Sequence, residues 1–204
     1  FRSITLAVIV MILTVVISLA AGLAYRKSFK FSGAVFYVTV ASLIVPSILI
    51  TLGIGLMFDR MDIEASWYTS GMGAHLTWTL PFGLLIMFAI FNRFDKSYEE
   101  AARDLGATPW QVMRFVVIPI ITPSLVGIGL FGFTLSFDEF ARSLLSVGSK
   151  NTLPLEIFGM TTTVTTPTLY ALGTLTTAVS FLIIGISFSA IAVIERRRRR
   201  HGSD

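Results

Sequence analysis

Two neighbouring carboxylates, Asp138 and Glu139, are the clearest candidates for contact with a solute. They lie roughly 20 residues beyond Pro119, and at about 1.5 Å of rise per helical residue this places them near the far end of an apolar stretch. Ionisable residues at such a depth in a membrane are costly and often mark the path of a solute. A carboxylate pair suits a cation. The alternative, which the residues leave open, is a structural pair neutralised by Arg142.

The sequence contains no residue set for metal binding or nucleophilic catalysis. It has no cysteine and two histidines, and the isolated His75 and His201 offer no ligand cluster. No G-x-S-x-G or H-E-x-x-H pattern supports an intramembrane enzyme, and no G-x-x-x-x-G-K-[ST] loop is present to bind ATP. We therefore expect no catalytic residue, metal or cofactor in this chain, and any ATP hydrolysis must occur in another subunit.

Residues 92–114 form a charged segment between two apolar stretches, and their pattern predicts two short helices. Two capping boxes of the form S/T-x-x-E/Q mark the helix starts: Ser97 with Glu100, and Thr108 with Gln111. Pro109 follows at the first helical position, where its missing N–H costs nothing. Gly106 separates the helices, because glycine can end a helix in the left-handed conformation.

The first of these helices is predicted to be amphipathic. One face carries the small and apolar residues Tyr98, Ala101, Ala102 and Leu105, and the other carries Glu99, Glu100, Arg103 and Asp104. Glu99 and Arg103 can pair at i, i+4, whereas Glu100 and Asp104 are like charges at the same spacing. The second pair invites an external basic partner.

The chain of 204 residues is 54% hydrophobic and 14% charged, which is more apolar than a soluble domain of this size. A bilayer core about 30 Å thick needs roughly 20 apolar residues of helix. Five stretches meet this requirement: Ile4 to Tyr25, Val35 to Phe58, Met72 to Phe91, Phe115 to Phe137 and Leu169 to Ile194. Pro46, Pro81 and Pro123 lie inside three of them and are expected to kink the helices.

Positive charge is concentrated on one side of these stretches. Most of the 16 Lys and Arg residues fall there: Arg26, Lys27, Lys30, Arg93, Lys96, Arg103, Arg114 and Arg196 to Arg200. The positive-inside rule predicts that this side, with the C-terminus, is cytoplasmic and that the N-terminus is outside. Because an outside N-terminus needs an earlier helix to translocate it, we expect one further span before residue 1.

The charged segment resembles a known motif. Glu100-Ala101-Ala102, three residues, Gly106, nine residues and then Val116 to Pro119 resemble the EAA loop of ABC importer permeases, E-A-A-x3-G-x9-I-x-L-P. Val116 and Ile118 depart from the pattern conservatively. The resemblance implies that this loop couples the permease to an ATPase subunit, through the residues Glu100, Ala101, Ala102, Asp104, Gly106 and Pro119.

The same resemblance implies a fold and an assembly. The fold is the all-α core of a type I ABC importer permease, as in methionine transporters, with residues 1–204 as a single transmembrane domain and about 92–114 as its coupling loop. The implied partners are ATP-binding cassette ATPase subunits, a second permease subunit, an external solute-binding protein and membrane lipid, with no nucleic acid. A heterodimer of permeases is expected, although the residues do not decide whether the second subunit is identical. The implied location is the bacterial inner membrane.

Ser136 to Phe140, with Asn151 to Leu155 and Thr166 to Thr168, is similar to the spermidine/putrescine branch of these permeases. This similarity implies a polyamine as the solute. Permeases for iron, sulfate, amino acids or phosphonates differ by few residues here and stay as alternatives. An ion-gradient secondary transporter is a further alternative, although no inverted repeat or pore signature is evident.

Overall fold

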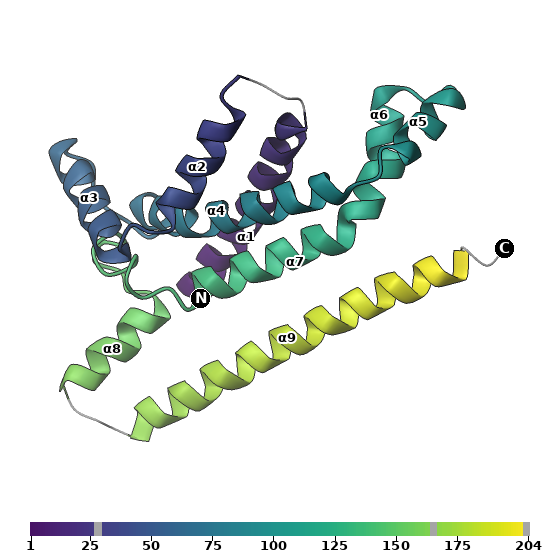
Figure 1. The fold of residues 1–204 in the computed structure, drawn as a ribbon. Helices are drawn as coiled ribbons and strands as arrows, with labels where there is room; N and C mark the ends of the chain where they lie inside the picture. Colours follow the sequence, from purple (N-terminus) through teal and green to yellow (C-terminus); the bar gives the residue numbers. More distant parts are fainter. Residues whose placement is uncertain (27–29, 164–166, 202–204) are drawn as a thin grey trace.

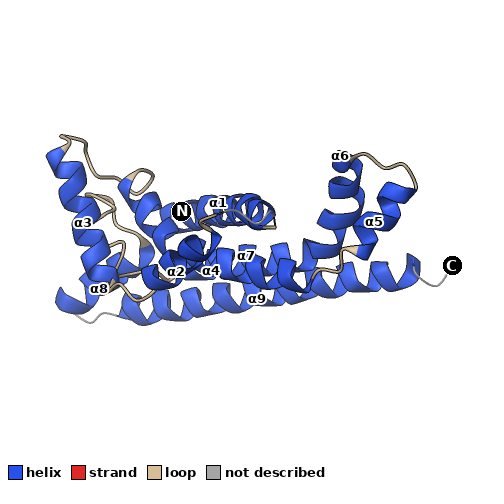
Figure 2. Ribbon diagram, turned by 45° about the horizontal axis from the view of Figure 1, so that its top comes forward, coloured by secondary structure: helices blue, strands red, loops and turns tan. Residues whose placement is uncertain are grey.

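The computed structural model describes residues 1–26, 30–163 and 167–201, and in these residues every regular element is a helix (Figures 1 and 2). The helices are α1 (Arg2–Tyr25), α2 (Ser32–Ser42), α3 (Ser47–Arg60), α4 (Ser70–Arg93), α5 (Ser97–Asp104), α6 (Pro109–Val112), the π-helical turn η1 (Met113–Val117), α7 (Ile118–Phe137), α8 (Leu153–Thr163) and α9 (Pro167–His201). The all-α class predicted from the sequence is confirmed. Lys27 and Thr166 lie outside the described residues, as do the side chains of Arg196 to Arg200.

Four described segments are long and apolar enough to cross a membrane: Arg2–Tyr25, Ser70–Arg93, Pro109–Phe137 and Pro167–Ile186. They correspond to the first, third, fourth and fifth predicted spans. Pro81 and Pro123 lie inside α4 and α7, as expected. The described residues contain five spans only if the bent pair α2 and α3 counts as one, in the place of the second predicted span.

The second predicted span, Val35 to Phe58, is not one kinked helix, because α2 and α3 meet at 101°. Pro46 has no N–H to donate, and its ring disfavours the helical conformation at the residue before it. The chain therefore leaves α2 in tight turns, in which the Leu43 N–H donates to the Val40 carbonyl at 3.1 Å. Helix α3 then starts afresh after Pro46, whose carbonyl accepts from the Leu49 N–H at 3.0 Å.

The centre of the molecule is the packing of α1 against α4 and α7. Small residues permit the close approach: a Cβ atom added to Gly83 of α4 would lie 2.3 Å from the Ser18 Oγ and 3.0 Å from the Thr14 Cγ2 of α1. The Thr14 and Thr79 hydroxyls are buried and 2.7 Å apart, within hydrogen-bond distance. Small residues and side-chain hydrogen bonds are the usual means of helix association in lipid, where burial of apolar surface gives little driving force.

The two ends of the helical body carry different elements. Figure 1 shows α5 and α6 at one end, and α3 and α8 at the other. Helix α9 packs on α7 and α8, and its C-terminal end lies toward α5 and α6 in both views. The charged segment and the C-terminal end of α9 therefore share one end of the molecule.

We predict that Gly83→Ala destabilises the protein by about 1–3 kcal/mol, because the added methyl group overpacks the contact between α1 and α4. Gly73→Ala is the matched control in the same helix, since a Cβ atom there meets nothing within 4 Å and alanine favours a helix over glycine by about 1 kcal/mol. The measurement is the thermal unfolding midpoint in detergent. Equal midpoints for the two variants would contradict this account of the packing.

Candidate coupling segment and solute-facing residues

The charged segment folds as a helix-turn-helix. Helix α5 ends at Asp104, with Leu105 as its C-cap, and Gly106 takes the left-handed conformation with φ of +84°. The chain then turns back, so that the Ala107 N–H donates to the Ala102 carbonyl at 3.0 Å. The helix stop predicted at Gly106 is confirmed. A side chain with a Cβ atom is strained in this conformation.

The second predicted capping box is present and the first is not. The Thr108 N–H donates to the Gln111 Oε1 at 2.8 Å, and the Gln111 N–H donates to the Thr108 Oγ1 at 3.4 Å. At the start of α5 the Ser97 side chain makes no cap, and its N–H instead donates to the Asp95 Oδ1 at 2.9 Å. That hydrogen bond lowers the pKa of Asp95, because it favours the charged carboxylate. The prediction for Ser97 and Glu100 was wrong because a nearer carboxylate competes for the same role.

The structure shows which residues of α5 turn inward. Glu99 is buried, whereas Leu105 is 90% exposed and Tyr98 is 56% exposed. Glu99 accepts hydrogen bonds from Arg26, at the end of α1, and from Arg103, which lies 3.4 Å away. These two cations stabilise the buried carboxylate, so the charged face of the helix turns inward at this point. Much of the predicted apolar face is left outward.

The proposed coupling residues divide between two environments. Glu100, Ala101, Asp104 and Gly106 are exposed on α5 and its turn. Ala102 is half-buried and packs against the cluster of Met87, Val112, Val117, Ile121 and Ile128. The outward surface also includes Trp110, 66% exposed, which the sequence analysis did not select. The sequence feature that could have indicated Trp110 is its place as an aromatic residue directly after the helix-starting Pro109.

Pro119 lies apart from these residues, in the first turn of α7. Because proline has no N–H to donate to the carbonyl four residues before it, a regular α-helical turn cannot be completed there. The structure widens this region into η1, where the Ile118 N–H donates to the Met113 carbonyl. Segment 109–137 thereby continues from the charged segment into the membrane as one helical body.

A groove of about 860 Å³ separates the end of α1 from α5 and α6. Its lining includes Leu23, Arg26, Lys96, Glu99 and Met113. Charged side chains therefore lie between α5 and α1.

At the other end of α7, the structure separates the two predicted solute-facing carboxylates. The Glu139 Oε1 accepts from the Arg142 N–H at 2.9 Å, and its Oε2 lies 3.7 Å from the Arg142 Nη1. Asp138 is exposed and lines a hollow of about 360 Å³ between α7, α8 and α9, with Phe140 and Phe158. The alternative of a structural carboxylate neutralised by Arg142 therefore applies to Glu139. Asp138 is the carboxylate that stays accessible.

Arg142 is fully buried and joins three parts of the chain. Its Nη1 donates to the Ser47 Oγ of α3 at 2.7 Å, and its Nε donates to the Thr77 Oγ1 of α4 at 3.3 Å. The guanidinium lies 4.4 Å from the centre of the Trp78 ring, a distance that permits a cation–π interaction. The turn after α7 is thus fixed to the helices that flank it.

His75 takes part in the same polar region. Its Nδ1 lies 2.8 Å from the Ser136 Oγ and its Nε2 lies 2.9 Å from the Ser143 Oγ. Both ring nitrogens are therefore occupied by hydroxyl groups. Among the described residues, no group of three or more His, Cys, Asp or Glu side chains could hold a metal ion.

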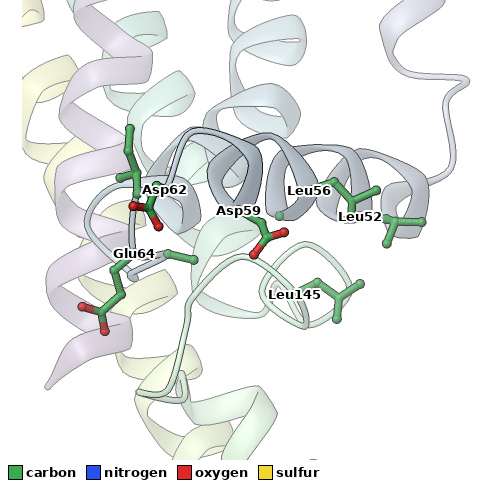
Figure 3. Close-up of a pocket in the computed structure, with 9 residues that line it drawn as sticks. Leu52, Leu56, Asp59, Asp62, Glu64 and Leu145 are labelled. Carbon is green, nitrogen blue, oxygen red and sulfur yellow. The ribbon is translucent and has the colours of Figure 1, made fainter.

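A separate pocket of about 560 Å³ lies between α3 and the turn that contains Leu145 (Figure 3). Asp59, Asp62 and Glu64 contribute carboxylates to its lining, beside Leu52 and other apolar residues. The sequence analysis selected none of these residues, because they are scattered over the end of a helix and a loop. Because α3 lies at the end of the molecule opposite α5 and α6 (Figure 1), the carboxylates of this pocket add negative charge at that end.

The chain is similar to permease subunits of polyamine transport systems. The spermidine/putrescine transport system permease protein PotC of Haemophilus influenzae is 32% identical over 175 residues, which cover 85% of this chain and 68% of the relative. PotC of Escherichia coli K12 is 29% identical, with 84% and 65% covered. The putrescine transport system permease protein PotI of the same strain is 29% identical, with 84% and 63% covered. The chain thus spans about two thirds of the length of these relatives.

The fold matches a solved ABC transporter. A chain of the MetNI methionine ABC transporter, in an inward-facing conformation, superposes with a TM-score of 0.74 and 17% identity over 95% of this chain and 93% of that one. This similarity confirms the predicted fold of a type I importer permease. The model of one protein family, described as "Binding-protein-dependent transport system inner membrane component", matches residues 14–201. The chain therefore belongs to this family and is a multi-pass membrane permease of the ABC importer type.

Proposed function

We propose that this chain forms the translocation path for a small cationic solute of the polyamine type, in an importer driven by a separate ATPase subunit. The observation that carries the proposal is the family match over residues 14–201, together with relatives whose names specify spermidine and putrescine transport. The geometry adds an outward coupling surface at one end of the helices and an accessible carboxylate at the other. The whole chain acts as one permease domain.

The outward surface of α5 and α6 supports docking of an ATPase. Tyr98, Leu105 and Trp110 are large and exposed on α5, the turn after it and α6. Exposed apolar side chains of this size commonly mark a protein interface. Glu100 and Asp104 stand exposed beside them, so the surface suits a groove with basic and apolar walls. ATP hydrolysis is assigned to that partner, and a second permease and a solute-binding protein complete the assembly.

The location of Asp138 supports a cationic solute. The Phe140 and Phe158 ring centres lie 4.8 Å apart, and both rings line the same hollow as the carboxylate. Aromatic faces and a carboxylate together attract organic cations. The carboxylates of the pocket in Figure 3 raise the local concentration of cations at that end of the molecule. An anionic solute such as sulfate would be repelled by both features.

We predict that the end carrying α5 and α6 faces the cytoplasm, because the basic connections are concentrated there and α9 ends on the same side (Figure 1). Reporter tags inserted after Gly106 and fused after Asp204 should both give cytoplasmic signals in bacterial cells. A periplasmic signal from either tag would contradict this orientation.

A further prediction concerns ATPase docking. Ala102→Phe should push α5 away from the cluster on which Ala102 packs, and Gly106→Val should disfavour the left-handed turn by about 1 kcal/mol or more. We expect each change to reduce ATPase retention on the purified permease about tenfold, with membrane insertion unchanged.

The matched controls keep the size or the backbone conformation. Ala102→Ser preserves a small side chain, and Gly106→Asn preserves a residue that tolerates the left-handed region. Both should retain the ATPase nearly as well as the parent chain. Full retention in the Phe and Val variants would show that this segment is not the coupling element.

Another prediction distinguishes the roles of the two carboxylates, Asp138 and Glu139. Asp138→Asn should raise the KM for spermidine uptake in proteoliposomes about tenfold, since one charge contact is lost, while assembly stays intact. Glu139→Gln should instead destabilise the protein by about 1–3 kcal/mol and so lower its unfolding midpoint, because the buried Arg142 loses its carboxylate. Unchanged uptake kinetics in Asp138→Asn would remove the residue-level support for a polyamine.

A further inference from the structure

The end of α1 is joined to the coupling segment through one arginine. Arg26 follows the last residue of α1, and its Nη2 donates to the Glu99 Oε1 in the first turn of α5. The same guanidinium lies 5.0 Å from the Phe91 ring centre in α4 and 5.2 Å from that of Phe94, just after α4. Arg26 therefore contacts α4, α5 and the segment between them from its place at the end of α1.

This ion pair is shielded from water. The Arg26 side chain is 16% exposed and the Glu99 side chain is 11% exposed. Charges removed from water to this extent interact more strongly than a surface pair, and removal of one partner leaves the other without compensation. Arg103, by contrast, is 58% exposed and lies 3.4 Å from the same carboxylate. The contact with Arg26 is the more constrained of the two.

The pair also bridges an open region. Helix α5 packs mainly on α6 and η1, and the groove of about 860 Å³ lies between it and the end of α1. Contact between α5 and α1 across the groove therefore depends on the Arg26 and Glu99 side chains. The ion pair thus links α5 to α1, the helix that packs on both α4 and α7.

Glu99 and Glu100 are adjacent and both line the groove, but only Glu99 is buried. Glu99 is buried against Arg26, and Glu100 is exposed on the surface assigned to the ATPase. Successive helical residues point about 100° apart, so one turn of α5 can contact the permease and a partner at once.

We infer that Arg26 and Glu99 are a positioning pair that transmits movement of the docked coupling helix to α1. This inference rests on the proposed function, since it requires an ATPase bound to α5. Breaking the pair should leave the ATPase docked, but the position of α5 relative to α1 should become more variable. ATP hydrolysis would continue while transport per ATP falls.

The test uses the complete transporter with Glu99→Gln and Arg26→Gln permeases in proteoliposomes. Both variants should retain the ATPase, and spermidine uptake per ATP hydrolysed should fall on the order of tenfold, within the range of site-to-site coupling. The double variant Arg26→Glu with Glu99→Arg should restore most of the uptake. Lys96→Gln is the matched control, because it removes a charge from the same groove, and it should match the parent chain.

A structural readout makes the test independent of the solute. The chain has no cysteine, so Ala20→Cys in α1 and Ser97→Cys in α5 provide specific sites for spin labels in the assembled complex. The distance distribution between the labels should be narrow in the parent chain and broader with Glu99→Gln. Equal widths, normal uptake per ATP in Glu99→Gln, or loss of the ATPase from that variant would each overturn the inference. Normal ATPase retention in Ala102→Phe would instead count against the proposed function itself.

Discussion

The close approach of α1 to α4 and α7 is the contact on which the rest of the structure depends. Lipid offers little hydrophobic driving force between helices, so their association relies on small residues and satisfied polar groups. Gly83 lets α4 reach Thr14 and Ser18, and the hydrogen-bonded Thr14 and Thr79 hydroxyls lie within that contact. Once α1 is fixed there, its two ends have fixed positions. One end carries Arg26 to the coupling segment, and near the other the Ser3 hydroxyl accepts from the Leu153 N–H at the start of α8.

The continuous body from α6 through η1 to α7 connects the coupling segment to that core. Val112 and Val117 belong to the same buried cluster as Met87, Ile121 and Ile128. The helix-turn-helix is therefore an extension of the membrane body, with its inner wall made by core residues. The π-helical turn before Pro119 allows this continuity at a residue that cannot complete an α-helical turn. A rigid connection of this kind is suited to carrying force between a docked partner and the spans.

Local chemistry made some features predictable from the sequence and left others out of reach. The stop at Gly106 and the capping box of Thr108 with Gln111 depend on residues within a few positions, and both were predicted. The inward orientation of Glu99 depends on Arg26, 73 residues away in sequence, so the pattern within α5 alone could not indicate it. The kink at Pro46 was predictable, but the 101° bend also reflects tertiary contacts. Thr51 of α3, for example, donates to the Arg142 carbonyl at 2.8 Å.

The two carboxylate pairs of the chain follow the same physical rule. Glu99 is buried with Arg26 while Glu100 stays exposed, and Glu139 is held by the buried Arg142 while Asp138 stays exposed. A buried carboxylate without a cation would cost several kcal/mol, so the position of each arginine selects which neighbour turns inward. The selected carboxylate fixes the local backbone to the helical core. Its neighbour then projects from a rigid site, and a rigid exposed charge loses less conformational entropy when a partner or a cation binds. Each buried ion pair thereby prepares the exposed carboxylate beside it, which explains how adjacent acidic residues can have separate structural and binding roles.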